Sequence, residues 1–267
     1  MGTDRRRGGP ESPRRRLPTG LATTDMPLYR EVRRRLLEAI SAGEWKPGSA
    51  IPSERELSAR FGVSVGTVRR AIDELCDDNL LVRQQGRGTF VAVHNRDRMM
   101  FHFFHIVGRD GTKETPVVKM LSFRAARADP RESQGLAIPP GAPVVRARNV
   151  LALGGRPVIY DQITIPRAMF PGLTMRAFRD RPNTIYHLYQ TAFGITVLRS
   201  LERLSGVLAD AEAASVLQVR VGAPLLEIKR VALTFNDAPV ELRRSLVDTS
   251  RHEYFSDLAK SGQPPAA

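Results

Sequence analysis

Several basic and hydroxyl side chains in the first hundred residues have the chemistry needed to bind a nucleic acid. Arg69 is expected on the exposed side of a helix, opposite Val68 and Ile72, where a guanidinium fork matches guanine O6 and N7. Ser64 and Thr67, near the start of the same helix, offer hydroxyls and helix amides to a phosphate. Each side chain taken alone could be a solvated surface group, so its meaning depends on the elements that hold it.

A glycine-flanked arginine, Gly86-Arg87-Gly88, adds a second feature of this kind. The two glycines give the backbone little bulk, so the tip of a hairpin at this point could approach a minor groove closely.

Arg146 and Arg148 form a pair that could bind an anion in the second half of the chain. They stand two residues apart in a predicted strand, so both side chains project from the same face. A pair of surface strand charges, or a salt bridge between subunits, explains the same pattern equally well.

Metal binding and redox sensing have weak support in the sequence. His102 and His105 could bind a metal if their segment were helical, but packed or solvated histidines are the simpler interpretation, and no metal or cofactor is predicted. Cys76, ahead of Asp77 and Asp78, has no basic neighbour in the sequence to activate its thiol, so an inert thiol is expected. The sequence also lacks a nucleophile–base pattern, a phosphate loop and a strong carboxylate pair, so we do not expect an enzyme.

Three helices are predicted to position the basic residues. Apolar residues recur every four positions from Leu28 to Ile40, and Gly43 closes that helix. Ser53 opens a second helix through a capping box with Glu56. This helix stops at residue 62, and residue 64 caps the third.

Two short strands, residues 81–85 and 89–91, flank the glycine-rich tip and are expected to pair as a hairpin. Three helices, a tight turn at residues 62–64 and a hairpin predict a winged helix-turn-helix over residues 26–93. In this fold the third helix enters a major groove while the second braces it.

The remainder is predicted to be a linker at residues 94–113 and an α+β domain with an antiparallel sheet at residues 114–258. Hairpin turns are expected at Gly154-Gly155 and Asn236-Asp237, and no internal repeat is predicted. The expected strands are 117–123, 143–153, 158–165, 196–208, 225–235 and 240–247, with helices near 131–136, 184–193 and 210–217. Residues 1–25 and 259–267 are expected to be disordered tails, although the basic first tail could also touch phosphates.

The composition of the 267 residues fits a two-domain protein of the cytoplasm. No run approaches the roughly 20 apolar residues of a membrane span, no secretory signal is recognised, and a single cysteine fits a reducing compartment. The net charge of +13 points to an anionic partner. However, residues 26–93 carry 11 lysines and arginines against 9 acidic residues, so the nucleic-acid hypothesis depends on where individual arginines lie.

With these segments in order, the chain resembles the GntR family of bacterial regulators, and specifically its HutC-like branch. The first half carries the matching motifs Pro27-Leu28-Tyr29, Trp45-Lys46-Pro47-Gly48, Pro52-Ser53-Glu54-Arg55-Glu56-Leu57, Phe61-Gly62-Val63-Ser64, Gly66-Thr67-Val68-Arg69 and Gln85-Gly86-Arg87-Gly88-Thr89-Phe90-Val91. The second half resembles the UTRA effector domain, which is related in fold to chorismate lyase. Its motifs include Val145-Arg146-Ala147-Arg148, Gly155-Arg156-Pro157-Val158, Pro224-Leu225-Leu226-Glu227-Ile228 and Pro239-Val240-Glu241.

The resemblance implies roles for individual residues. It makes Arg55 and Arg69 contacts to bases or phosphates, and it makes Asp161, Thr184 and Glu241 polar groups of an effector pocket. It implies a ligand-responsive regulator that represses transcription as a homodimer on an inverted-repeat operator of double-stranded DNA, with a small-molecule effector that could be an anion.

Two departures from the family pattern qualify these expectations. Val65 stands where many relatives have an arginine that reads a base, so we expect a different operator at that position, with Arg70 as a partial substitute. Val247 replaces a frequent tyrosine, which disfavours a sugar phosphate as effector. Two alternatives stay open: a constitutive DNA-binding regulator whose second domain only dimerises, and an enzyme of lyase-like fold.

Overall fold

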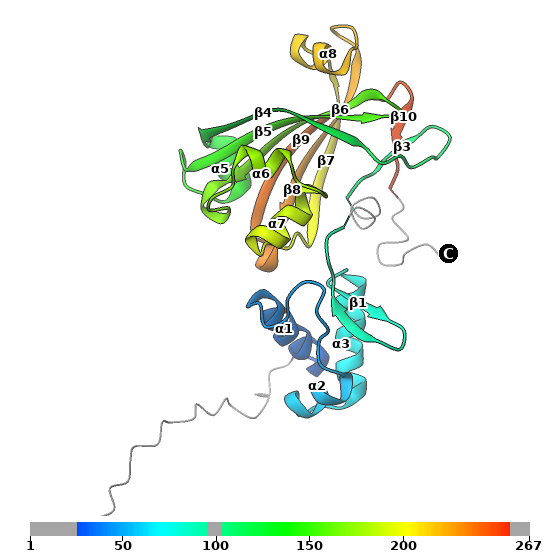
Figure 1. Cartoon of the computed structure of the whole chain (residues 1–267), viewed down its shortest axis with the longest axis vertical. Helices are drawn as coiled ribbons and strands as arrows, with labels where there is room; N and C mark the ends of the chain where they lie inside the picture. The colour runs from blue at the N-terminus through cyan, green and yellow to red at the C-terminus, as the bar shows by residue number, and fades with distance from the viewer. Residues whose placement is uncertain (1–25, 96–102, 257–267) are drawn as a thin grey trace, which may run out of the picture.

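Three helices and a hairpin form the first unit of the structure, a computed structural model that describes residues 26–95 and 103–256 (Figure 1). The elements are α1 (Leu28–Ser41), α2 (Glu54–Phe61), α3 (Val65–Asp77), β1 (Leu81–Gln84) and β2 (Gly88–Val91), and the two strands pair antiparallel. This is the predicted winged helix-turn-helix, and we call it the winged-helix domain.

The predicted caps determine where α2 and α3 begin. The Ser53 hydroxyl accepts the backbone N–H of Glu56 at 3.3 Å, and the Glu56 carboxylate accepts the N–H of Ser53 at 2.8 Å. The Ser64 hydroxyl accepts the N–H of Thr67 at 3.2 Å. Between them Gly62 ends α2 with φ of +68°, a left-handed conformation that favours glycine. These local bonds keep the turn between the two helices short.

Buried apolar side chains from all three helices hold the winged-helix domain together. Leu36 of α1, Leu57 of α2 and Ile72 of α3 are almost completely excluded from solvent and belong to one cluster. Burying a side chain of this size contributes about 1.5–3 kcal/mol. The stripe of apolar residues seen in the sequence is therefore what orients the exposed faces of α2 and α3.

Six antiparallel strands form the sheet of the second unit, the sheet domain, in the order β4-β5-β6-β9-β8-β7 (Figure 1). Gly154-Gly155 turns β5 into β6, and the 3-10 turn η2 (Phe235–Asp237) joins β8 to β9, so both predicted hairpins are present. The strands are β4 (Val117–Arg127), β5 (Pro143–Leu153), β6 (Arg156–Pro166), β7 (Arg199–Leu208), β8 (Pro224–Leu233) and β9 (Pro239–Val247).

The sheet domain contains the same β-α-β-β arrangement twice, which the sequence pattern did not reveal. The first copy is β4, α5 (Pro130–Leu136), β5 and β6, and the second is β7, α8 (Ala211–Leu217), β8 and β9. Asp129 and Asp210 cap the two helices, and Ala137 and Gln218 end them in the left-handed region. The copies meet where β6 pairs with β9, which explains the strand order.

The sheet has two faces with different coverings. Helices α5 and α8 pack on the outer face. Helices α6 (Met175–Arg179) and α7 (Ile185–Phe193) cover part of the inner face, and the strand pair β3 (Ile106–Gly108) and β10 (His252–Tyr254) covers another part. The five-residue α6 and the strands β3 and β10 were not predicted, because such short elements show no periodicity.

The predicted linker is partly built into the sheet domain. Phe103 and Phe104 are buried on the inner face, and Ile106–Gly108 pairs with β10. Elsewhere the boundaries shift by a few residues: the strand expected from Thr196 begins at Arg199, and Phe235 belongs to the turn and not to β8. The predictions for the two tails and for His102 concern residues outside those described.

Candidate DNA interface and effector cavity

The first turn of α2 and the first two turns of α3, with the cap Ser64, carry most of the predicted nucleic-acid contacts. Arg55, Ser64 and Arg69 are all exposed. The hydroxyl oxygens of Ser64 and Thr67 lie 2.8 Å apart, so the two residues form one polar group at the start of α3. The amides of a first helical turn have no acceptors within the helix, which makes this end attractive to an anion.

The tip of the β1–β2 hairpin has the backbone conformation expected of a narrow wing. Gly86 has a φ of +71° and Gly88 a φ of +112°, and residues other than glycine rarely adopt either value. Arg87 between them is exposed. The tip therefore combines a thin backbone with a positive charge.

Val65 and Arg70 occupy different surroundings on α3. Val65 is 38% exposed and forms an apolar spot in the first turn of the helix. The guanidinium of Arg70 stacks on the ring of Tyr29 in α1, 3.9 Å from the ring centroid. This stacking engages one face of the guanidinium while the side chain remains at the surface.

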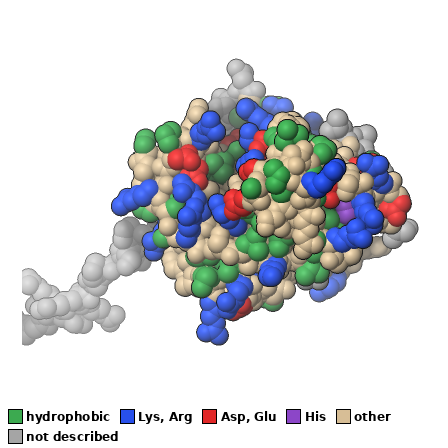
Figure 2. Space-filling model, turned by 90° about the horizontal axis from the view of Figure 1, so that it is seen from above, with side chains coloured by type: hydrophobic (Ala, Val, Ile, Leu, Met, Phe, Trp, Pro, Cys, Tyr) green, Lys and Arg blue, Asp and Glu red, His purple; other side chains and the backbone are tan. Residues whose placement is uncertain are grey.

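Basic side chains elsewhere do not gather in one patch in the view of Figure 2. Lysines and arginines there lie between acidic and apolar side chains over the surface. In residues 26–93 the 11 basic and 9 acidic residues nearly balance, so the predicted DNA contacts there are distinguished by position and not by charge density.

A cavity of about 830 Å³ opens on the inner face of the sheet, beside the first turn of α7. Apolar residues of β4, β5 and β6, such as Val118, Leu151 and Ile163, form much of its wall. The polar groups that line it are Asn149, Asp161, Arg179, Arg181, Asn183, Thr184 and Arg243, together with Lys119.

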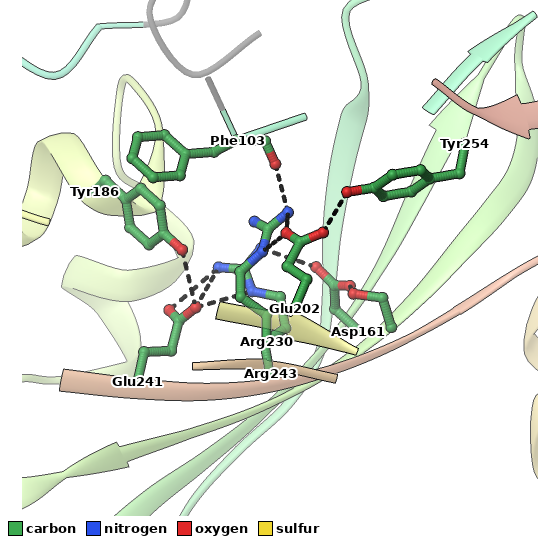
Figure 3. A network of polar contacts seen from close by, with 9 residues as sticks. Phe103, Asp161, Tyr186, Glu202, Arg230, Glu241, Arg243 and Tyr254 are labelled. Atoms are coloured by element: carbon green, nitrogen blue, oxygen red, sulfur yellow. Dashed lines mark hydrogen bonds and ion pairs between the residues drawn. The ribbon is translucent and has the colours of Figure 1, made fainter. Parts of the chain in front are cut away.

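A buried ion-pair network lies at the base of this cavity (Figure 3). The Arg243 guanidinium donates to Glu241 at 2.9 and 3.1 Å and to Asp161 at 3.2 Å. Asp161 also accepts the Ser245 hydroxyl at 2.5 Å. Burial opposes the charge on Arg243, but the carboxylates of Glu241 and Asp161 outweigh it and raise the pKa of the guanidinium. Both carboxylates therefore share one guanidinium as their ion-pair partner among the described residues.

A second network connects the inner face to its covering segments (Figure 3). Arg230 pairs with Glu202 at 2.5 Å and donates to the backbone carbonyl of Phe103 at 2.5 Å. The Tyr254 hydroxyl donates to Glu202 at 2.6 Å. Residues 103 and 254 are thus tied to β7 and β8 by charged hydrogen bonds.

Two groups in the cavity are left for a ligand. Asn149 is only 2% exposed, and its Oδ1 has no hydrogen-bond partner among the described residues. A buried acceptor without a donor costs roughly 1–3 kcal/mol, so such atoms usually have a function. Arg181 donates to the Phe178 carbonyl and lies over the Phe178 ring, but it forms no ion pair with any residue that the structure describes, and burial lowers the pKa of its guanidinium.

The structure brings together three of the five predicted effector residues. Asp161 and Thr184 line the cavity, and Glu241 lies fully buried beneath it, bonded to Arg243.

Arg146 and Arg148 lie on the outer face and do not line the cavity. Arg146 donates to Glu132 of α5 at 2.8 and 2.6 Å, and Arg148 pairs with Glu212 of α8. The shared face that their spacing predicts is present, but acidic side chains of the two helices already occupy their guanidinium groups.

The residues that sequence reasoning missed are Asn149, Arg181 and Arg243. For Asn149, the alternation of side chains along β5 carried a signal. Val145, Ala147 and Leu151 are buried on the inner face, so Asn149 is the polar residue in phase with the apolar ones. Arg181 lies in a loop, where no periodicity could have indicated its direction.

Helix α7 links the cavity to the winged-helix domain. Its first residues border the cavity. Further along, the buried Gln190 donates to the carbonyl of Ala92 at 3.1 Å and accepts the N–H of His94 at 2.8 Å. The His187 ring also lies within hydrogen-bond distance of the His94 carbonyl, at 2.6 Å. One helix therefore contacts both the cavity and the segment that leaves β2.

A second cavity, of about 1030 Å³, lies between the two domains. Ion pairs border it on both sides: Arg33 with Asp78 at 2.5 Å, and Arg199 with Asp237 at 2.8 Å. These charged side chains already have partners, so the cavity in the sheet domain is the better candidate for a ligand.

The alternative chemistries find no support in the structure. Residues 26–95 and 103–256 contain no group of three or more His, Cys, Asp or Glu side chains arranged to hold a metal. Cys76 is half-buried, and burial raises the pKa of its thiol, which opposes a reactive thiolate.

Comparisons with known proteins match both domains. The family described as "Bacterial regulatory proteins, gntR family" matches residues 28–91, and the UTRA domain matches residues 112–253. The chain is a gntR-family regulator with a UTRA domain. The family and the fold expected from the sequence motifs are thereby confirmed.

Relatives and solved structures agree with this assignment of the regulator. The histidine utilization repressor of Klebsiella aerogenes is 32% identical over 209 residues, which cover 76% of this chain and 83% of the relative. The mannosyl-D-glycerate transport/metabolism system repressor MngR of Escherichia coli (strain K12) is 28% identical and covers 85% of this chain and 94% of its own length. These relatives are named as repressors, and the family is one of regulators and not of enzymes.

The crystal structure of the ligand-binding domain of a GntR-family regulator from Bordetella bronchiseptica has a TM-score of 0.56 at 29% identity, covering 59% of this regulator and 98% of that chain. YydK of Bacillus subtilis covers 87% of this regulator and 99% of that chain, with a TM-score of 0.53 at 17% identity, and shows the shared fold. Among the described residues of the regulator, none of the helices is both long and apolar enough to cross a membrane.

Proposed function

We propose that this regulator represses transcription as a homodimer bound to an inverted-repeat operator, and that a small anionic effector in the UTRA cavity releases it. One combination carries the proposal: a winged helix-turn-helix with exposed arginines is joined to a cavity in which Arg181 has no ion pair and Asn149 Oδ1 no hydrogen bond among the described residues. A protein with this function works in the cytoplasm, where bacterial chromosomal DNA lies.

On the DNA side, Arg69 and Arg55 are the proposed readers of base edges or phosphates. Ser64 and Thr67 bind a phosphate at the start of α3, and the Gly86-Arg87-Gly88 tip follows the minor groove. Their exposure on one domain supports this assignment. Val65 contacts an apolar group such as a thymine methyl, and Arg70, five residues further along α3, adds a positive charge at the surface.

On the effector side, two features of the cavity favour an anion. The Arg181 guanidinium has no carboxylate partner among the described residues, whereas Asp161 and Glu241 are both bonded to Arg243. The first turn of α7 borders the cavity at Thr184, and a helix N-terminus favours negative charge. The Oδ1 of Asn149 accepts a hydrogen bond from a donor elsewhere on the ligand.

Homodimerisation follows from the exposed edge of the sheet. Strand β7 lies at the end of the strand order and pairs with β8 over ten residues without a register shift, whereas β4 at the other edge has an irregularity after Met120. Leu201, Leu204 and Leu208 of β7 are exposed. An antiparallel edge can pair with its own copy about a two-fold axis, which matches the symmetry of an inverted repeat.

The proposed signal passes along α7. An anion that binds Arg181 and Thr184 shifts the start of this helix, and its contacts through Gln190 to residues 92–94 carry the shift to the winged-helix domain. The effector must favour the released arrangement by a few kcal/mol for the operator to be vacated.

The test begins with the fragment upstream of the regulator's own gene and with duplexes selected from a random pool. Retarded migration of a selected duplex, and its release by one member of a panel of small organic anions, are the expected results. If no duplex is bound at low ionic strength, DNA recognition by α3 is wrong. If a duplex is bound but neither anionic nor neutral metabolites release it, the regulator is constitutive and the UTRA domain only dimerises.

A further inference from the structure

One carboxylate, that of Glu54, contacts two arginines that lie on different elements of the winged-helix domain. Glu54 is the first residue of α2. Its Oε2 accepts the Arg69 Nε–H at 2.9 Å and lies 2.9 Å from Arg69 Nη2. Its Oε1 accepts from Arg83 Nη2 at 3.1 Å. Because Arg69 belongs to α3 and Arg83 to β1, this side chain connects both helices of the helix-turn-helix with the wing.

The contact with Glu54 leaves available the N–H groups of Arg69 that would contact a base. A guanidinium has five N–H donors in a fixed plane, and Glu54 occupies those along the Nε and Nη2 edge. The Nη1 group and the second Nη2 hydrogen point away from this edge, and they form the end-on fork that matches guanine O6 and N7. The arginine side chain is 59% exposed and the glutamate 22%, so Arg69 is the more accessible of the two side chains.

We propose that Glu54 is a specificity-determining residue that positions Arg69 for base recognition. This inference rests on the proposed role of α3 in the major groove. Glu54 does not touch the DNA itself. It restricts the rotamers of a long side chain before binding, so that less conformational freedom is lost when the fork meets its base.

The negative charge of Glu54 also increases the preference for the operator over unrelated DNA, by a second effect. Phosphates attract any basic surface regardless of sequence, and a carboxylate beside two arginines weakens that attraction. Glu54 therefore lowers the affinity for unrelated DNA while favouring the operator. Asp73, 2.8 Å from Arg83 Nη2, keeps a partner for Arg83 when Glu54 is removed, so the change acts mainly through Arg69.

The test compares the full-length regulator with Glu54→Gln, which keeps the size of the side chain, and Glu54→Ala. The readout is the ratio of affinities for a duplex selected by the wild-type chain and for its shuffled sequence. Both variants should lower this ratio about tenfold, because weakening one bidentate base contact reduces discrimination against the wrong base by about this factor. The loss should concentrate at the base pair where Arg69→Ala also relaxes the preference, and Glu54→Ala should add little to Arg69→Ala.

Glu44→Gln provides a matched control. Glu44 pairs with Arg60, in the last turn of α2, at 2.5 Å, so the variant removes the same charge from the other end of that helix. Circular dichroism and thermal unfolding establish that each variant is folded, and the conservative Glu54→Asp is expected to restore part of the ratio.

The outcomes separate the inference from the function on which it rests. If the wild-type chain selects no duplex, the proposed function fails. If Arg69→Ala relaxes one base pair but the Glu54 variants keep the full ratio, or change it no more than Glu44→Gln does, the positioning role is wrong. Effects of Glu54→Ala and Arg69→Ala that add fully in the double variant also overturn it.

Discussion

Gln190 of α7 accepts a hydrogen bond from the backbone N–H of His94 at 2.8 Å, and His94 lies in the segment that leaves the winged-helix domain. The same side chain donates to the Ala92 carbonyl and to the Thr196 hydroxyl, and it is buried. A single amide thus holds the chain that leaves the winged-helix hairpin against the UTRA domain. This contact links the helix that borders the cavity to the segment that follows β2.

Gln190→Ala is expected to loosen the two domains from each other. The substitution leaves the N–H of His94 and the carbonyl of Ala92 without their side-chain partner, so the free energy of unfolding should fall by roughly 1–3 kcal/mol. Calorimetry should then resolve a separate, earlier transition of the winged-helix domain. Gln134→Ala, on the exposed surface of α5, is the control. A variant that unfolds in one transition at the wild-type temperature would show that this amide does not couple the domains.

Arg181→Gln is expected to abolish most of the response to an anionic effector, whereas Arg148→Gln should not. Arg181 lines the cavity without a carboxylate partner among the described residues, while Arg148 lies on the outer face beside Glu212. A charged hydrogen bond is worth roughly 1.5–3 kcal/mol, so affinity for the effector should fall at least tenfold. Calorimetric titration with the metabolite that releases the operator measures this. The reverse ranking of the two variants would restore the strand arginines as the ligand site.

The elements of this fold with a strong local signature were predictable from the sequence. The helices α1 to α3 show a long apolar stripe or a cap, and both main hairpins have turn residues that demand positive φ. By contrast, β3 and β10 are stabilised by pairing with each other, although most of the UTRA domain separates them in the sequence. Three residues cannot show alternation, so only the tertiary structure determines them.

The cavity was only partly predictable for a related reason. Family motifs located Asp161, Thr184 and Glu241, but a pair of arginines two residues apart indicates a shared face and not which face it is. That choice depends on which helices cover each side of the sheet. The contact of Glu54 with Arg69 and Arg83 spans three elements, so it too required the packed structure.

Val65→Arg is expected to change which operator the regulator prefers. The exposed valine can contact only apolar groups, whereas a guanidinium at the first turn of α3 can pair with guanine. One base position should therefore shift towards guanine, by roughly 1–3 kcal/mol against the original base. Selection of duplexes from a random pool by both proteins measures the shift. Identical selected sequences would place residue 65 away from the bases.

Glu241→Gln is expected to destabilise the UTRA domain strongly. Glu241 is fully buried and accepts hydrogen bonds from Arg243 and from the Tyr189 hydroxyl, at 2.7 Å for the latter. Removing one member of a buried ion pair costs about 3–5 kcal/mol, and Asp161 remains as a partner for Arg243, so a loss at the lower end, about 3 kcal/mol, is expected.

Denaturant unfolding of Glu241→Gln, beside the exposed control Glu253→Gln, provides the measurement. Burial, followed by the charge of Glu241, raises the pKa of Tyr186 to about 12, so this tyrosine should ionise at lower pH in the variant. A loss of stability below about 1 kcal/mol would mean that Arg243 is satisfied without Glu241.

Acid should destabilise the regulator through the pair His105 and Glu202. Burial lowers the pKa of His105 from its ordinary 6.5, so protons bind more readily to this residue in the unfolded chain, and stability is lost as the pH falls below about 6.5. Burial alone would raise the pKa of Glu202, but Arg230 and the Tyr254 hydroxyl outweigh it and lower this pKa, which adds a loss at still lower pH. Each group contributes a slope of at most about 1.4 kcal/mol per pH unit. Denaturant unfolding from pH 8 to pH 5 measures the slope of the unfolding free energy against pH. This slope should be smaller for His105→Gln than for wild type or for His252→Gln. Equal slopes in all three proteins would contradict the assignment to His105.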